Sequence, residues 1–100
     1  YLFGYYVHEE LVGFIHVVKL IDELEIINVV VDKEYRHRGI GKKLIMYVVN
    51  YFNDIKSIFL EVSNKNEAAI GLYDSLGFSI INIRKNYYKD SDALIMRKEK

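Results

Sequence analysis

The chain has 100 residues, 51% of them apolar, which is enough for one domain with a real core and excludes a disordered tail. Basic and acidic residues balance at 14 each, so net charge provides no general attraction, and neither nucleic acid nor a membrane is an expected partner. Cysteine is absent, which rules out disulfides and thiolate chemistry and is typical of a cytoplasmic protein.

The first third of the chain has the pattern of three strands. Residues 1–7 and 11–20 are rich in aromatic and β-branched residues, with a polar break between them, which predicts a hairpin. A second acidic break precedes residues 24–31, whose last six positions are nearly all apolar, as in a strand that is buried on both faces. We therefore expect an antiparallel meander.

The apolar period then changes from two to about 3.6, which predicts a helix from about Gly39 to Asn53. A strand is expected at residues 57–62. A second helix follows, with Asn66 as a plausible N-cap and Gly77 as its stop.

The end of the chain is predicted to form a strand at residues 78–84, a loop at 85–92 and a closing strand at 93–98. The resulting order is β-β-β-α-β-α-β-β. Helices that cross between strands require some parallel pairing. The predicted fold is therefore an α/β fold with a mixed, mostly antiparallel sheet of about six strands flanked by helices.

The stretch EYRHRGIGKKL, residues 34–44, combines two glycines with five basic or imidazole side chains. A Walker-type phosphate loop needs a hydroxyl where Lys43 stands. A dinucleotide-binding G-x-G-x-x-G needs a third glycine where Leu44 stands. Both patterns fail, which leaves a solvated basic turn or an anion-binding turn.

The position of this turn, between a strand and a helix, favours anion binding. The first N–H groups of a helix point outward together, at the positive end of its dipole. The expected donors are the backbone N–H groups of Gly39, Ile40, Gly41 and Lys42. Flanking positive charge would come from the side chains of Arg36, His37, Arg38 and Lys42.

The motif R-x-x-G-x-G at Arg36, Gly39 and Gly41, followed by LEVSNKNEAAIGLYDSLGF, resembles the acetyl-CoA-binding core of the GNAT superfamily of N-acetyltransferases. Together with RKNYYKDSDALIMRK, the segment LEVSNKNEAAIGLY most resembles the protein N-terminal acetyltransferases, which include the RimI-type ribosomal-protein alanine acetyltransferases. The resemblance covers about residues 11–98. It implies one GNAT domain over residues 1–100, acetyl-CoA as donor, no metal, and a protein N-terminus, such as that of a ribosomal protein, as acceptor.

The resemblance also implies a binding mode for the donor. In that family the CoA pyrophosphate binds to the glycine turn, which corresponds to residues 37–42. The pantetheine arm lies along the preceding strand, which implies backbone contacts from Val29, Val30 and Val31. Asn66 matches a position whose side chain contacts the cofactor, although a role as helix N-cap explains it equally well.

Acetyl transfer requires a neutral amine and a stabilised thiolate. Glu61 matches the proposed general base of the RimI-type enzymes, and the alternative is an ordinary glutamate at a strand end. Tyr73 matches the proposed general acid, and the alternative is helix packing. A phenol with a pKa near 10 is a weaker acid than a thiol near 8.5, so we expect Tyr73 mainly to hydrogen-bond the sulfur. Tyr87 and Tyr88, on the last predicted loop, match tyrosines that contact the backbone of the acceptor.

Family members usually begin with a strand and two helices before the position of Tyr1, so we expect the N-terminal strand and helices to be missing here. The three histidines have no spacing that suggests a metal site. Two other functions remain open. One is acetylation of a small-molecule amine, such as a polyamine or an aminoglycoside, and the other is a non-catalytic acyl-CoA-binding subunit.

Overall fold

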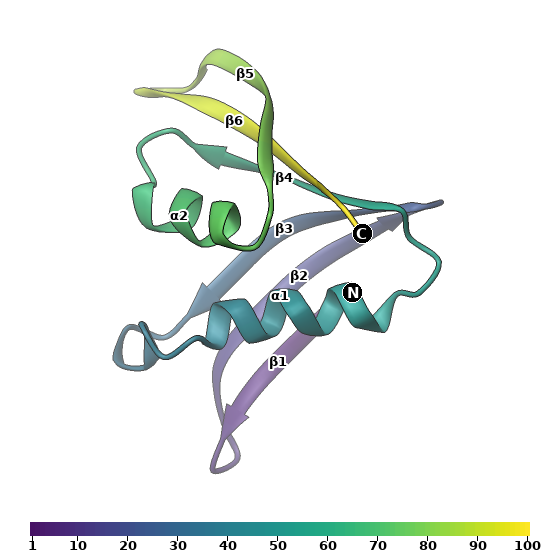
Figure 1. Cartoon of the computed structure of the whole chain (residues 1–100). Helices are drawn as coiled ribbons and strands as arrows, with labels where there is room; N and C mark the ends of the chain where they lie inside the picture. The colour runs from purple at the N-terminus through teal and green to yellow at the C-terminus, as the bar shows by residue number, and fades with distance from the viewer.

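The computed structural model describes residues 1–100 and has the predicted order of strands and helices (Figure 1). A short 3₁₀ turn at Lys33–Tyr35 precedes the first helix. The elements are β1 (Leu2–Val7), β2 (Glu10–Leu20), β3 (Glu23–Val31), α1 (Ile40–Tyr51), β4 (Ser57–Ser63), α2 (Glu67–Ser75), β5 (Ser79–Tyr88) and β6 (Ser91–Glu99).

All six strands form one sheet, in the order β1-β2-β3-β4-β6-β5. Only the β3 and β4 pair is parallel, because helix α1 carries the chain back between these two strands. The other pairs are antiparallel. The predicted mixed, mostly antiparallel sheet of six strands is therefore confirmed.

The core lies between the sheet and the two helices, which pack side by side on one face. A Cβ atom added at Gly41 of α1 would lie 3.4 Å from Leu72 of α2. One cluster of 20 buried residues includes alternating positions of the strands and the apolar stripe of α1. Burial of each large aliphatic side chain contributes about 1.5 to 3 kcal/mol. The stripe of α1 consists of Ile40, Leu44, Ile45, Val48 and Val49.

Glycine and asparagine delimit the helices, as expected in a chain without proline. Gly39 precedes α1 with a φ of 78°, and Gly77 follows α2 with a φ of 94°. The side chain of Asn66 accepts a hydrogen bond of 3.2 Å from the N–H of Ala69. The predicted N-cap of α2 and its predicted stop are both confirmed. Neither helix is long and apolar enough to cross a membrane.

Strands β3 and β4 separate halfway along their length. They pair only from Glu23 to Ile26 on β3, opposite Ser57 to Leu60 on β4. On β3 the next residue, Ile27, has no partner on β2, because His16 pairs with Asn28 and Val17 with Ile26. Such a bulge bends a strand. Beyond it the two strands diverge toward their carboxyl ends, as Figure 1 shows.

Two predictions about strands are wrong. The second half of β3 is not buried on both faces, since Ile27 is 44% and Val30 is 38% exposed. The helices cover only one face of the sheet, and β4 no longer pairs with this part of β3. The predicted loop at residues 85–92 is instead the end of β5, a two-residue turn and the start of β6. Tyr87 and Tyr88 therefore lie on a strand.

Candidate active site

The divergence of β3 and β4 opens a cavity of about 350 Å³. It brings together five of the residues singled out from the sequence: Val29, Glu61, Asn66, Tyr73 and Tyr88. Tyr87, Val30, Val31 and the glycine turn do not line it. The complete lining is Ile26, Ile27, Asn28, Val29, Leu60, Glu61, Val62, Ser63, Asn66, Ala69, Tyr73 and Tyr88.

The backbone of β3 on the side of this cavity has no strand partner. Residues 28–31 pair with β2 on one side, whereas the pairing with β4 ends at Ile26. Backbone N–H and C=O groups on an unpaired strand edge are available to a ligand. Backbone groups alternate between the two edges of a strand, and the hydrogen bond from the N–H of Asp32 to the carbonyl of Val12 fixes this alternation. The groups of Val29 and Val31 therefore face the open edge, as expected for ligand contacts, whereas those of Val30 face Phe14 of β2.

Glu61 lies on β4, where the strand passes the cavity. Its neighbours Leu60 and Val62 are buried in the core, so its side chain points to the opposite face of the sheet. The side chain is 26% exposed, and its Oε2 atom lies 3.4 Å from Nη1 of Arg84 on β5. The carboxylate is thus accessible at the rim of the cavity.

Tyr73 lies on α2 and reaches the same cavity from the helical face of the sheet. Only 8% of the residue is exposed, and its ring lies 5.7 Å from that of Phe78. Burial raises the pKa of the Tyr73 phenol above its ordinary value. Its hydroxyl makes no hydrogen bond within the chain, so it is free to donate one to a ligand. Both the packing and the donor roles suggested by the sequence therefore fit.

The glycine turn offers a row of free donors. No backbone N–H group from His37 to Lys42 donates to another group of the chain. Gly39 and His37 adopt positive φ angles of 78° and 63°, and the space beside the Cα atom of Gly39 is open. An oxyanion can approach such a backbone closely. The residues of the turn therefore fit a phosphate group.

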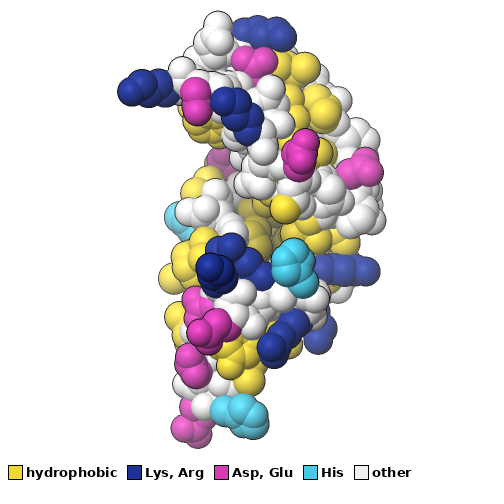
Figure 2. Space-filling model, turned by 90° about the vertical axis from the view of Figure 1, so that its left-hand side faces the viewer, with side chains coloured by type: hydrophobic (Ala, Val, Ile, Leu, Met, Phe, Trp, Pro, Cys, Tyr) yellow, Lys and Arg dark blue, Asp and Glu magenta, His cyan; other side chains and the backbone are white.

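Basic side chains surround the turn, and Lys, Arg and His gather near the middle of the face that carries it (Figure 2). Two of them already have partners in the chain. Arg36 donates from Nε to the carbonyl of Val31 at 3.1 Å, and the Arg38 guanidinium lies 5.0 Å from the ring centre of Tyr35. Gly41 has a packing role as well, since α2 lies against it.

Tyr87 and Tyr88 follow an irregularity in β5. Adjacent residues of a regular strand point to opposite faces, yet these two rings touch edge to face at 5.2 Å. Tyr88 lines the cavity, and Tyr87 is 52% exposed outside it. The pKa of Tyr88 is raised, first by burial and then by the negative charge of Glu61 and by Tyr87.

Arg84 is a site residue that sequence reasoning missed. Besides its ion pair with Glu61, its guanidinium lies 5.4 Å from the ring centre of Tyr87. The only signal in the sequence is a basic residue three positions before the tyrosine pair. Because the contact with Glu61 crosses strand β6, it depends on sheet order and could not be inferred from spacing.

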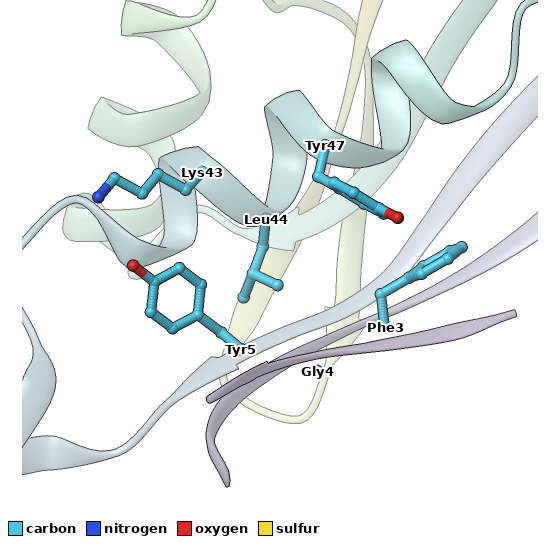
Figure 3. Close-up of a pocket in the computed structure, with 6 residues that line it drawn as sticks. All are labelled: Phe3, Gly4, Tyr5, Lys43, Leu44 and Tyr47. Carbon is cyan, nitrogen blue, oxygen red and sulfur yellow. The ribbon is translucent and has the colours of Figure 1, made fainter. Parts of the chain in front are cut away.

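A second cavity, of about 260 Å³, lies between β1 and the first turns of α1 (Figure 3). Its walls are mostly aromatic or aliphatic, and its one cation, Lys43, lies 5.9 Å from the ring centre of Tyr5. No carboxylate or imidazole lines it. It therefore lacks a group suited to act as a base near neutral pH. The lining residues are Phe3, Gly4, Tyr5, Lys43, Leu44 and Tyr47.

The chain matches the model of the Acetyltransferase (GNAT) family over residues 1–78 and belongs to this family. The [ribosomal protein bS18]-alanine N-acetyltransferase of Escherichia coli strain K12 is 37% identical over 76 residues, which are 74% of this chain and 51% of that protein. The chain thus spans about half the length of the curated relatives it matches.

Two solved structures extend this similarity. The ribosomal-protein-S18-alanine N-acetyltransferase from Escherichia coli has a TM-score of 0.93 at 32% identity, over 99% of this chain and 68% of that chain. A putative streptothricin acetyltransferase from Bacillus anthracis strain Ames, in complex with acetyl coenzyme A, has a TM-score of 0.91 at 29% identity, over 99% of this chain and 61% of that chain. These similarities agree with the predicted GNAT fold.

Proposed function

We propose that this chain forms the donor-binding and catalytic part of an acetyl-CoA-dependent N-acetyltransferase that acts on the α-amine of a protein N-terminus. The observation that carries the proposal is that Glu61 and Tyr73 reach one cavity from opposite faces of the sheet. The similarity to an alanine N-acetyltransferase of a ribosomal protein supports a ribosomal acceptor, and hence a cytoplasmic location.

The residues of the chain fit the donor at two places. The N–H groups of residues 37–42 would hold the pyrophosphate, assisted by the basic side chains of the turn. The open edge of β3 would hold the pantetheine arm through backbone groups of Val29 and Val31, and Asn66, which lines the same cavity, would lie near it. When bound, acetyl-CoA would supply the activated acetyl group as a thioester.

Glu61 would accept the proton of the incoming amine, directly or through water. An α-amine has a pKa near 8, so roughly a tenth to a third is already neutral near pH 7, whereas a lysine side chain near 10.4 is almost fully protonated. A single partly exposed carboxylate is therefore sufficient for an α-amine.

Tyr73 would donate its hydroxyl to the sulfur as negative charge develops there. Its raised pKa keeps the phenol neutral and able to donate, and makes complete proton transfer to a thiolate less favourable. Tyr87 and Tyr88 would hold the backbone of the first acceptor residues next to Glu61. No residue of the site needs to form a covalent intermediate.

The test measures thiol release from acetyl-CoA by the full-length protein. Peptides that contain an internal lysine are compared with a free and with a blocked N-terminal amine. Turnover of the free peptides alone is the expected result. Equal rates with the blocked peptides would rule out the α-amine as the acceptor.

A small-molecule acceptor is the second candidate, because of the similarity to a putative streptothricin acetyltransferase. Polyamines and aminoglycosides are tested in the same assay. Turnover of one of these, without turnover of peptides, would replace the proposal. Tight acetyl-CoA binding with no turnover of any amine would instead favour a non-catalytic acyl-CoA-binding subunit.

A further inference from the structure

The hairpin of β5 and β6 contains an irregularity next to the tyrosine pair. Arg84 pairs with Ala93 and Tyr88 with Ser91, so residues 85–87 of β5 all lie opposite the single residue Asp92 of β6. In the middle of this bulge, Asn86 has a φ of 53°, in the left-handed region. A bulge of this kind interrupts the ladder and redirects side chains.

The side chain of Asp92 takes the place of the missing strand partner. Its Oδ1 atom accepts a hydrogen bond of 2.8 Å from the N–H of Asn86. Its Oδ2 atom lies 3.6 Å from Nζ of Lys85, and 21% of the side chain is exposed. One carboxylate therefore binds two consecutive residues of the bulge, immediately before Tyr87 and Tyr88.

The backbone of Asp92 binds Asn64, in the segment that follows β4. Its N–H donates to Oδ1 of Asn64 at 3.2 Å, and its carbonyl accepts from the N–H of Asn64 at 3.0 Å. The hydroxyls of Ser63 and Ser91 are hydrogen-bonded beside them at 2.9 Å. Asn64 lies in the short segment between β4, which carries Glu61, and α2. Asp92 thus links the tyrosine pair to the elements that carry Glu61 and Tyr73.

We propose that Asp92 is a positioning residue for the acceptor, and that its carboxylate fixes the bulge that places Tyr87 and Tyr88 at the cavity. This inference rests on the proposed function, in which the two tyrosines hold the acceptor. Without the carboxylate, the N–H of Asn86 loses its acceptor and nothing balances its left-handed conformation. The bulge relaxes, and the rings leave the geometry in which Tyr88 lines the cavity.

The test separates the Michaelis constants of the two substrates in the full-length protein. Asp92→Ala is expected to raise the KM for an acceptor peptide about tenfold and to change the KM for acetyl-CoA by less than about twofold. Asp92→Asn keeps an oxygen for the N–H of Asn86 and is expected to restore most of the peptide affinity. Asp90→Ala is the matched control, because Asp90 contacts only Lys65 and its side chain is 79% exposed.

A second pair of variants reaches the same bulge without altering Asp92. Asn86→Val places a β-branched residue at a positive φ and is expected to raise the peptide KM as Asp92→Ala does. Asn86→Gly accepts that φ and keeps the N–H, so it is expected to resemble the wild type. An unchanged peptide KM in both Asp92→Ala and Asn86→Val overturns the proposal, as does an equal rise in the KM of both substrates.

Tyr88→Ala distinguishes this inference from the proposed function. A raised peptide KM in Tyr88→Ala, together with an unchanged one in Asp92→Ala, overturns the role of Asp92 and leaves the acceptor role of the tyrosines intact. An unchanged peptide KM in Tyr88→Ala means that Tyr88 does not contact the acceptor, and it overturns the role of Asp92 while the proposed α-amine acetyltransferase activity is decided separately by the free and blocked peptides.

Discussion

Arg84 and Glu61 form an ion pair across strand β6, with 3.4 Å between Nη1 and Oε2. The same guanidinium lies over the ring of Tyr87, at 5.4 Å from its centre. One cation on an edge strand therefore contacts both the candidate base and the candidate acceptor wall. Because Arg84 is 54% exposed, the pair can hold the carboxylate in place without closing the cavity.

Arg84→Ala is expected to lower turnover several-fold and to leave the melting temperature almost unchanged. A half-exposed ion pair contributes about 0 to 1 kcal/mol to folding, whereas loss of the guanidinium frees the Glu61 carboxylate to rotate away from the amine. Steady-state kinetics and thermal melts check this. Arg84→Lys, which keeps a cation, is expected to recover part of the turnover, and a wild-type rate for Arg84→Ala would show that the ion pair is dispensable.

Glu61→Gln is expected to lower turnover and to steepen its rise with pH. Without the carboxylate, the reaction depends on the fraction of amine that is already neutral and on proton transfer to water. The measurement is a pH profile of turnover for the variant and the wild type. Glu99→Gln on β6 is the control, because its side chain is 76% exposed at the far end of the strand. If Glu61→Gln has a wild-type profile, another group is the base.

Tyr73→Phe is expected to lower turnover by about 10- to 100-fold, because a hydrogen bond to the developing thiolate is lost. The ring still packs against Phe78, so the fold is retained. Tyr47→Phe is a matched control on α1, where the residue is 55% exposed. A loss of less than twofold in Tyr73→Phe would limit Tyr73 to a packing role.

The raised pKa of Tyr73 also predicts how stability depends on pH. Below about pH 10 the phenol is neutral in both the folded and the unfolded state, so its contribution is constant. As the pH rises above 10, the Tyr73 phenol ionises more readily in the unfolded than in the folded state, and the free energy of unfolding therefore falls. Thermal melts from pH 9 to about 11 are therefore expected to fall more steeply for the wild type than for Tyr73→Phe. Parallel curves would contradict the raised pKa.

Gly39→Ala is expected to raise the KM for acetyl-CoA several-fold and to cost about 1 kcal/mol of stability. The added methyl group occupies the open space beside the free N–H groups, and the φ of 78° is unfavourable for alanine. Gly71→Ala, in the middle of α2, is the control. It meets no atom within 4 Å and is expected to stabilise the protein by about 0.5 to 1 kcal/mol. Equal effects of the two variants would contradict this role of Gly39.

Local signals in the sequence predicted the elements and their order well. Asn66 and Gly77 delimit α2 as expected, because capping and the left-handed stop depend only on neighbouring residues. The residues that line the cavity were partly predicted through the family resemblance. Their meeting at one cavity depends on the register of β3 and β4, which local patterns do not encode.

The errors have a common physical cause. The polar stretch at residues 85–92 predicts a loop, whereas the structure continues β5 through the tyrosine pair by means of the bulge opposite Asp92. The apolar second half of β3 was expected to be buried because its composition is that of a central strand. The bulge at Ile27 separates this segment from β4, so it is partly exposed despite its apolar composition.

The separation of β3 and β4 leaves the sheet unfinished at its centre. Between Ile27 and Val31 the backbone groups on the edge of β3 that faces the cavity have no strand partner, and the carbonyl of Val31 accepts a hydrogen bond from the side chain of Arg36 instead. The amide groups of a pantetheine arm would meet the same hydrogen-bonding demand as a neighbouring strand. The bound donor would then occupy the place of a strand in the sheet. The free energy of these hydrogen bonds would contribute to the affinity for acetyl-CoA and would raise the melting temperature of the complex.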